Sequence, residues 1–332
     1  MSIKPSALPN DNCPDAKLKF FSAVFALILC ARTLSVAADS AIFALPPEIQ
    51  NAAKRSMDQA LNTNYAASFL AIEKIHSQNP GVACVLKNIV RLTKFDDLGD
   101  TLALEKAAEE LADCQADGAW DVLREFELGY AKSAQGHSFK GALATRRAAK
   151  KFEDSQDKDA RAIYSIYAYY VEDGFGFLPF ISDDRENHLK ILEERAAHSP
   201  LFWAIFATPL AWMYYDKEEY DKALTVVERS LAKSPKNPIF IQMKADMLYK
   251  QKRYAEAAAI YENSAAEYLK RSGKSVRYFC AIGNLARIYL DAGKENLSRQ
   301  NAEKLNDPDY KKIENWMPES LVKDLKKKKL YP

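Results

Sequence analysis

A 34-residue spacing recurs in the second half of the chain and restricts the possible folds more than any other feature. The stretches EEYDKALTVVERSLAKSPKNP (218–238) and KRYAEAAAIYENSAAEYLKRSG (252–273) both contain Tyr-x-x-Ala. The same offset links further identical residues, which are Ala211 and Ala245, Tyr215 and Tyr249, and Ser230 and Ser264. A fixed period of this length predicts stacked helical hairpins, in which each repeat buries its apolar face against the next.

Each repeat divides into a first helix, here called the A helix, and a second helix, the B helix. Ala211 and Ala245 are small residues at positions where the A helix must approach a neighbour closely. The B helices begin at Tyr220 and Tyr254, and each has an alanine three residues later for the same reason. Pro235 ends a B helix, because proline lacks the amide donor and clashes with the preceding turn.

Composition and periodicity predict an all-α fold. The chain has 11 Gly and 14 Pro in 332 residues, too few for a loop-rich β-protein, and no useful stretch alternates as strands do. The predicted helices are 47–61, 64–78, 82–95, 101–116, 119–134, 138–153, 158–171, 184–198, 203–216, 218–233, 238–251, 254–270, 275–292 and 295–305. A last short helix is predicted after Pro318.

The segment 207–271 resembles the tetratricopeptide repeat family, whose units are 34-residue helical hairpins with small residues at the helix crossings. A third unit follows, with Leu285, Ala286, Tyr289 and Gly293 at the family's A-helix positions. The step from Ala245 to Ala286 is 41 residues, which indicates an insertion of about seven residues in EYLKRSGKSVR. The resemblance implies a superhelical array of antiparallel hairpins, an α-solenoid.

The pattern is thinner before residue 176, where it predicts degenerate hairpins. Tyr65 and Pro80 have the spacing of Tyr220 and Pro235. The segment EDGFGFLPFISDDR (172–185) interrupts helix on both sides and is the candidate internal boundary. We therefore predict four segments: 1–38, a signal peptide; 39–175, degenerate hairpins; 176–310, tetratricopeptide-like repeats; and 311–332, a short helix with a basic tail.

The first 38 residues have the pattern of a secretory signal. Lys17 and Lys19 precede the apolar run FFSAVFALILCA (20–31), and SVAADS supplies small residues for cleavage before Asp39. The run is too short to span a membrane comfortably. We expect export to the periplasm or cell envelope, with a buried N-terminal helix as the alternative.

Export would place three cysteines in an oxidising compartment. Cys84 opens one predicted helix and Cys114 closes the next, and these ends lie side by side in an antiparallel hairpin. We predict a Cys84–Cys114 disulfide, worth about 3–4 kcal/mol in the chain-entropy model. The alternative is that these residues and Cys280 are buried thiols that pack as small apolar side chains.

The sequence contains no recognisable catalytic, cofactor or metal motif. Its four histidines, His76, His137, His188 and His198, lack metal-ligand spacing. Nucleophile motifs and a dinucleotide fingerprint are also missing. A net charge of +2 gives no electrostatic basis for binding nucleic acid. We expect a protein that is not an enzyme and that binds no cofactor, metal or nucleic acid.

The stretch YSIYAYYVEDGFGFLPF (164–180) is the densest aromatic cluster. Aromatic side chains at helical spacing usually fill a core, and we interpret these as the seam between two blocks of hairpins. The alternative is an enzyme whose site lies near this loop. A third hypothesis is a membrane-associated assembly factor, held by an uncleaved N-terminus or by the basic run Lys326–Lys329.

In the register set by the three A-helix alanines, the resemblance implies that the A helices line a peptide-binding groove. The inward positions are Thr208, Trp212, Tyr215, Gln242, Met243, Asp246, Tyr249, Asn284 and Arg287. Some members of the family hold a partner's terminal carboxylate here with Lys, Asn and Arg. This chain has Trp212 and Met243 instead, which favours a partly apolar extended or helical segment oriented by charged residues. The alternative is that Trp212 and Met243 pack against neighbouring helices.

The function that these features predict is an exported interaction scaffold. It would bind a protein or peptide partner in the groove and would take part in cell-envelope assembly or secretion.

Overall fold

The computed structural model describes residues 43–175 and 183–331, and within these ranges every regular element is a helix. The all-α prediction is therefore confirmed, and consecutive helices pack against each other as hairpins. The predicted signal peptide and part of the predicted loop, residues 176–182, lie outside the described residues.

The chain divides into two compact units, and each boundary between them falls within a helix. The described C-terminal unit consists of residues 94–101 and 211–331, and the N-terminal unit of residues 43–93 and 102–210. Two boundaries lie within α4 (Pro80–Leu98) and α10 (Trp203–Asp216), and the third follows the first residue of α5 (Thr101–Asp113). The division thus differs from the one predicted at the loop 172–185.

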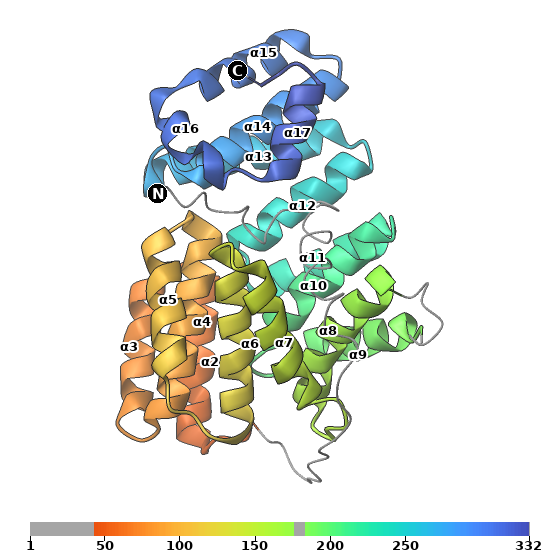
Figure 1. Cartoon of the computed structure of the whole chain (residues 1–332). Coiled ribbons are helices and arrows are strands. Elements are labelled where there is room, and N and C mark those ends of the chain that lie inside the picture. The colour runs from red at the N-terminus through yellow and green to blue at the C-terminus, as the bar shows by residue number, and fades with distance from the viewer. Residues whose placement is uncertain (1–42, 176–182, 332) are drawn as a thin grey trace. The chain divides into compact units, whose positions relative to one another are not determined.

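The N-terminal unit contains helical hairpins joined by short turns. Besides parts of α4 and α10, it contains α2 (Pro47–Leu61), α3 (Tyr65–His76), α5 (Thr101–Asp113), α6 (Gly118–Ala134), α7 (Ser138–Lys150), α8 (Lys158–Phe175) and α9 (Arg185–His198). The pairs α2/α3, α6/α7 and α8/α9 pack side by side (Figure 1). In each pair, the apolar face of one helix is buried against the apolar face of the other.

The α6/α7 crossing depends on two glycines. A Cβ atom at Gly129 would lie 2.9 Å from the carbonyl oxygen of Gly141, and one at Gly141 would lie 2.6 Å from that of Gly129. Real Cβ atoms do not approach backbone so closely, and any larger residue would push the helices apart. Glycine therefore performs here the role that alanine performs in the repeats of the C-terminal unit.

A disulfide joins Cys84 on α4 to Cys114 just after α5, with 6.1 Å between their Cα atoms. Arg91 of α4 forms an ion pair with Glu110 of α5 at 2.5 Å. Cys280 is buried outside any disulfide, and its Sγ lies 3.9 Å from Sδ of Met317. The α4/α5 pair is thus fixed both covalently and by charge.

The C-terminal unit contains the repeat hairpins. The B helices are α11 (Tyr220–Lys233), α13 (Tyr254–Ser272) and α15 (Glu295–Glu303), and the A helices after α10 are α12 (Pro238–Lys250) and α14 (Val276–Asp291). Two short α-helices follow, α16 (Pro308–Ile313) and α17 (Glu319–Lys327), separated by the 3-10 turn η3 (Glu314–Trp316). Figure 1 shows α17 returning to lie beside α14, on which it packs.

The small residues of the repeat lie at the helix crossings. Ala211, Ala245 and Ala286 on the A helices, and Ala223 and Ala257 on the B helices, are all fully buried. In the third hairpin Ser298 takes the position of these B-helix alanines. Its hydroxyl donates to the carbonyl oxygen of Ala286 at 2.7 Å, so the buried hydroxyl is satisfied.

The predicted insertion lengthens a B helix. Helix α13 has 19 residues and α11 has 14, so part of the longer step between repeats is extra helix. Near that end, Arg271 pairs with the buried carboxylate of Asp97 at 2.5 Å, and the Tyr268 hydroxyl donates to it at 3.3 Å. These contacts join the end of α4 to α13 within the C-terminal unit.

Candidate functional site

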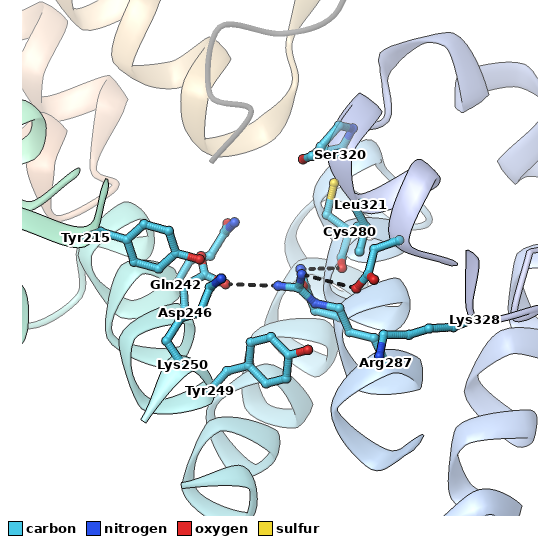
Figure 2. Close-up of a pocket in the computed structure, with 13 residues that line it drawn as sticks. Tyr215, Gln242, Asp246, Tyr249, Lys250, Cys280, Arg287, Ser320, Leu321 and Lys328 are labelled. Atoms are coloured by element: carbon cyan, nitrogen blue, oxygen red, sulfur yellow. Dashed lines mark hydrogen bonds and ion pairs between the residues drawn. The ribbon is translucent and has the colours of Figure 1, made fainter. Parts of the chain in front are cut away.

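A pocket of about 310 Å³ opens in the C-terminal unit between α12, α14 and α17, and we call it the A-helix pocket. Figure 2 shows its side chains converging from these helices and from Tyr215 of α10. Its lining consists of Tyr215, Gln242, Asp246, Tyr249, Lys250, Cys280, Asn284, Arg287, Pro318, Ser320, Leu321, Asp324 and Lys328.

Helical periodicity explains why these residues meet. Side chains three and four positions apart share one face of a helix. Gln242, Asp246 and Tyr249 therefore form one stripe on α12. Asn284 and Arg287 form the facing stripe on α14. The pocket is the space between the two stripes.

Arg287 is the central cation of the pocket. Its guanidinium carbon lies 4.6 Å from the centre of the Tyr249 ring, and Nη2 lies 3.5 Å from Oδ1 of Asp246. Nη1 lies 3.7 Å from Oδ2 of Asp324 on α17. Figure 2 shows the guanidinium of Arg287 facing Asp246. Burial would lower the pKa of Arg287, but the Asp246 carboxylate outweighs that effect and raises the pKa above its ordinary value. The group therefore stays charged.

Two buried polar atoms of the pocket residues have no hydrogen-bond partner, namely Nε of Arg287 and Oδ1 of Asn284. The amide nitrogen of Asn284 donates to the carbonyl oxygen of Cys280 at 3.0 Å, which fixes the side chain, and Asn284 is 5% exposed. An unsatisfied buried polar group costs about 1–3 kcal/mol. A bound molecule that offered an acceptor to Arg287 and a donor to Asn284 would recover that free energy.

The acidic residues around the pocket are held in place by tyrosines. The Tyr261 hydroxyl of α13 donates to Oδ1 of the buried Asp246 at 2.6 Å. The Tyr249 hydroxyl donates to Oδ2 of Asp291 at 2.5 Å, and Lys328 donates to Oδ1 at 2.6 Å. Burial and, to a lesser extent, the hydrogen bond to Asp291 raise the pKa of Tyr249 well above its ordinary value, so the Tyr249 hydroxyl keeps its proton and remains a donor.

The structure brings six of the nine predicted groove residues together at this pocket, namely Tyr215, Gln242, Asp246, Tyr249, Asn284 and Arg287. The prediction that Met243 lines the groove is wrong, because its side chain is 1% exposed and packs in the core. It lies at the edge of the pocket stripe, about 100° around the helix axis from Gln242, where its apolar side chain is buried.

The other two predicted residues do not line the pocket. Trp212 is half-buried and packs edge-to-face on Tyr215, with 5.3 Å between ring centres. Thr208 belongs to the N-terminal unit, and its hydroxyl donates to the carbonyl oxygen of Ala204 at 3.0 Å. Trp212 can thus support the position of Tyr215, whereas Thr208 is used within its own helix.

Sequence reasoning missed the wall of the pocket that α17 supplies. Pro318, Ser320, Leu321, Asp324 and Lys328 come from this segment. A signal was present, because Leu321 and Leu325 are four residues apart and thus on one helix face. That spacing predicts that α17 packs on something, but it does not identify α14 as the surface.

The alternative site near residues 164–180 contains a buried polar cluster in its described part. Nδ1 of His188 lies 3.2 Å from Oγ of Ser165, and Nε2 lies 3.4 Å from Oε1 of Glu172. The Ser165 hydroxyl donates to the carbonyl oxygen of Arg161 at 2.9 Å, so His188 must donate to it. A nucleophile needs the opposite arrangement, with the serine donating to its base. The cluster, with Ser165 fully buried, has the geometry of a contact between α8 and α9.

Within 43–175 and 183–331, no group of three or more His, Cys, Asp or Glu side chains is placed to hold a metal ion. None of the helices in those ranges combines the length and the apolar character needed to cross a bilayer.

Comparison with known proteins gives no family assignment. No protein-family model matches the chain, and no curated protein matches it.

Proposed function

We propose that this protein is an interaction scaffold of the tetratricopeptide type, and that its A-helix pocket binds a segment of a partner protein. The observation that carries the proposal is the convergence of side chains from three successive A helices around one pocket. Two of those residues have buried polar atoms without partners.

The pocket chemistry supports a polypeptide ligand with mixed character. The rings of Tyr215 and Tyr249 offer apolar contact with fixed hydroxyl groups, a combination that is common at protein interfaces. Three cations, Lys250, Arg287 and Lys328, and two carboxylates, Asp246 and Asp324, offer charge of both signs. A ligand with charges of only one sign would be repelled by the pocket groups of that sign. A peptide can place acidic residues beside the pocket cations and basic residues beside the pocket carboxylates.

We also propose that the scaffold acts outside the cytoplasm, in the periplasm or envelope. This part of the proposal is supported by the signal pattern in residues 1–38 and by the Cys84–Cys114 disulfide, which persists in oxidising compartments. The mass of the exported protein tests it directly. Loss of residues 1–38 would support it, and retention of them would favour the membrane-anchored alternative.

The experiment for binding compares matched variants in affinity capture from the envelope fraction of the same cells. Gln242→Ala and Tyr215→Ala remove pocket side chains, and we expect each to reduce recovery of the specific partner at least about tenfold, as hot-spot substitutions do. Gln300→Ala is the control, because Gln300 is exposed on α15. Equal recovery by all the variants would contradict the proposal.

A further inference from the structure

Helix α17 occupies the same face of α14 that supplies Asn284 and Arg287. Leu321 and Leu325 are 4% and 0% exposed. Each has a methyl carbon 3.2 Å from where a Cβ atom of Gly283 would lie. Gly283 therefore creates a flat seat on α14, which we call the Gly283 seat, and the two leucines fill it. On its other side α17 is charged, with Lys323 exposed.

The contact between Asp324 and Arg287 is weaker than the apolar contacts of α17. Asp324 faces Arg287, but the two groups are 3.7 Å apart, beyond hydrogen-bonding distance. The Asp324 side chain is 29% exposed, so water screens the pair. Arg287 keeps an unpartnered Nε while α17 is in place. The Gly283 seat thus holds α17 although α17 provides no hydrogen-bond acceptor for Nε of Arg287.

We propose that α17 is an exchangeable internal occupant of the Gly283 seat, and that the partner which replaces it is an amphipathic helix of the same chemistry. Such a helix has two leucines, or similar apolar residues, four positions apart. An acidic residue between them, at the position of Asp324, faces Arg287. This inference rests on the proposed function and narrows its ligand from any polypeptide segment to a helix.

Two physical arguments make exchange feasible. A helix of nine residues is not stable alone in water, so α17 is helical because of its seat. An attached segment competes at an effective concentration in the millimolar range, which a partner with a better-placed acid can overcome. A longer carboxylate side chain, Glu in place of Asp, would reach the guanidinium that Asp324 approaches only to 3.7 Å.

The test uses a fluorescent peptide of residues 317–331 and the full mature chain. Leu321→Asp in the chain puts a carboxylate into the apolar seat and should release α17. We expect the free peptide to bind this variant at least about tenfold more tightly than the wild-type chain, in which α17 competes. A peptide carrying Leu325→Asp should not bind. Equal affinity for both chains, or no binding to the folded Leu321→Asp chain, would overturn the proposal.

A charge exchange shows whether the peptide sits beside Arg287. With Arg287→Asp added to the Leu321→Asp chain, the wild-type peptide should bind at least about tenfold more weakly, because two carboxylates then face each other. A peptide with Asp324→Arg should regain that affinity. Failure of the exchanged pair to restore binding, with the double variant folded by circular dichroism, would place the peptide elsewhere on the surface and refute the assigned seat.

Hydrogen exchange of the wild-type chain keeps the proposal testable if Leu321→Asp impairs folding. Amides of α17 should exchange at least about tenfold faster than those in the middle of α14, because an exchangeable helix opens without unfolding its seat. Equal protection of both helices would refute the proposal. Capture of a partner that depends on Gln242, combined with no binding of the 317–331 peptide, would support the proposed function and refute only this inference. Peptide exchange without any such partner would support the seat and contradict the proposed function.

Discussion

The guanidinium of Arg287 lies over the ring of Tyr249, with 4.6 Å between the guanidinium carbon and the ring centre. The contact joins α14 to α12, and the buried Asp246 lies on the same stripe of α12 as Tyr249. One residue thus connects two successive A helices through a ring and a carboxylate.

Replacing Arg287 should destabilise the C-terminal unit to a degree that depends on charge. Arg287→Gln leaves the buried Asp246 without its cation, which costs about 3 kcal/mol for a broken buried pair. Arg287→Lys keeps the charge but loses the planar stacking on Tyr249, and we expect a cost of about 1 kcal/mol. Urea unfolding measures both. Equal losses for the two variants would show that the charge on Arg287 does not matter.

The contribution of Asp291 to stability should disappear in acid. Partial desolvation alone would raise its pKa, but hydrogen bonds from Lys328 and Tyr249 outweigh that and lower it. A depressed carboxyl pKa stabilises the fold above the unfolded value of about 4, and the stabilisation is lost as the pH falls through the folded value. The melting temperature of Asp291→Asn should therefore lie below that of the wild type at pH 6 and approach it below about pH 4. A difference that stays constant across that range would contradict this assignment.

Glycine at the turn between α12 and α13 should stabilise the protein. Lys252 has a φ of 61°, a left-handed conformation that costs a residue with a Cβ atom about 1 kcal/mol. The equivalent positions are Glu218, with a φ of 61°, and Gly293, with a φ of 73°. We expect Lys252→Gly to raise the free energy of unfolding by about 0.5–1 kcal/mol. Ala266→Gly, at an exposed position within α13, should lower it by about as much.

Overpacking a helix crossing should destabilise the array. Ala257 is fully buried, so a leucine there forces α12 and α13 apart at a cost of about 1–3 kcal/mol. Ala259 is exposed on the same helix, and Ala259→Leu should change the stability by less than about 0.5 kcal/mol. Denaturant unfolding of the pair tests the repeat register. Similar values for both would mean that Ala257 does not lie at a crossing.

Reduction of the Cys84–Cys114 disulfide should weaken the N-terminal unit. Closing a loop with a sequence separation of 30 stabilises a fold by about 3–4 kcal/mol in the chain-entropy model. The unfolding free energy should fall by about that amount in dithiothreitol. The Cys84→Ala/Cys114→Ala double variant should show the lower value with or without reductant. An unchanged wild type would mean that the thiols are not bridged.

The sequence was sufficient to predict the helices and the pocket register in the C-terminal unit. Tyr220 and Tyr254, Ala211 and Ala245, and Ala223 and Ala257 are each 34 residues apart because the two hairpins have the same crossing. That register placed Asp246 of α12 and Arg287 of α14 on facing sides of the predicted groove. Met243 was assigned wrongly because it lies at the edge of the stripe on α12, where an apolar side chain packs into the core. The seat of α17 and the division at Leu210 depend on tertiary packing, which local spacing does not encode.

Site-specific photo-crosslinking in living cells tests the central claim most directly. A photoreactive residue at Gln242 lies in the A-helix pocket, and one at Gln300 lies on the exposed surface of α15. We predict that Gln242 crosslinks to a discrete partner protein and that Gln300 does not. The same adduct at both positions, or an adduct at Gln300 alone, would contradict the claim that this pocket binds the partner.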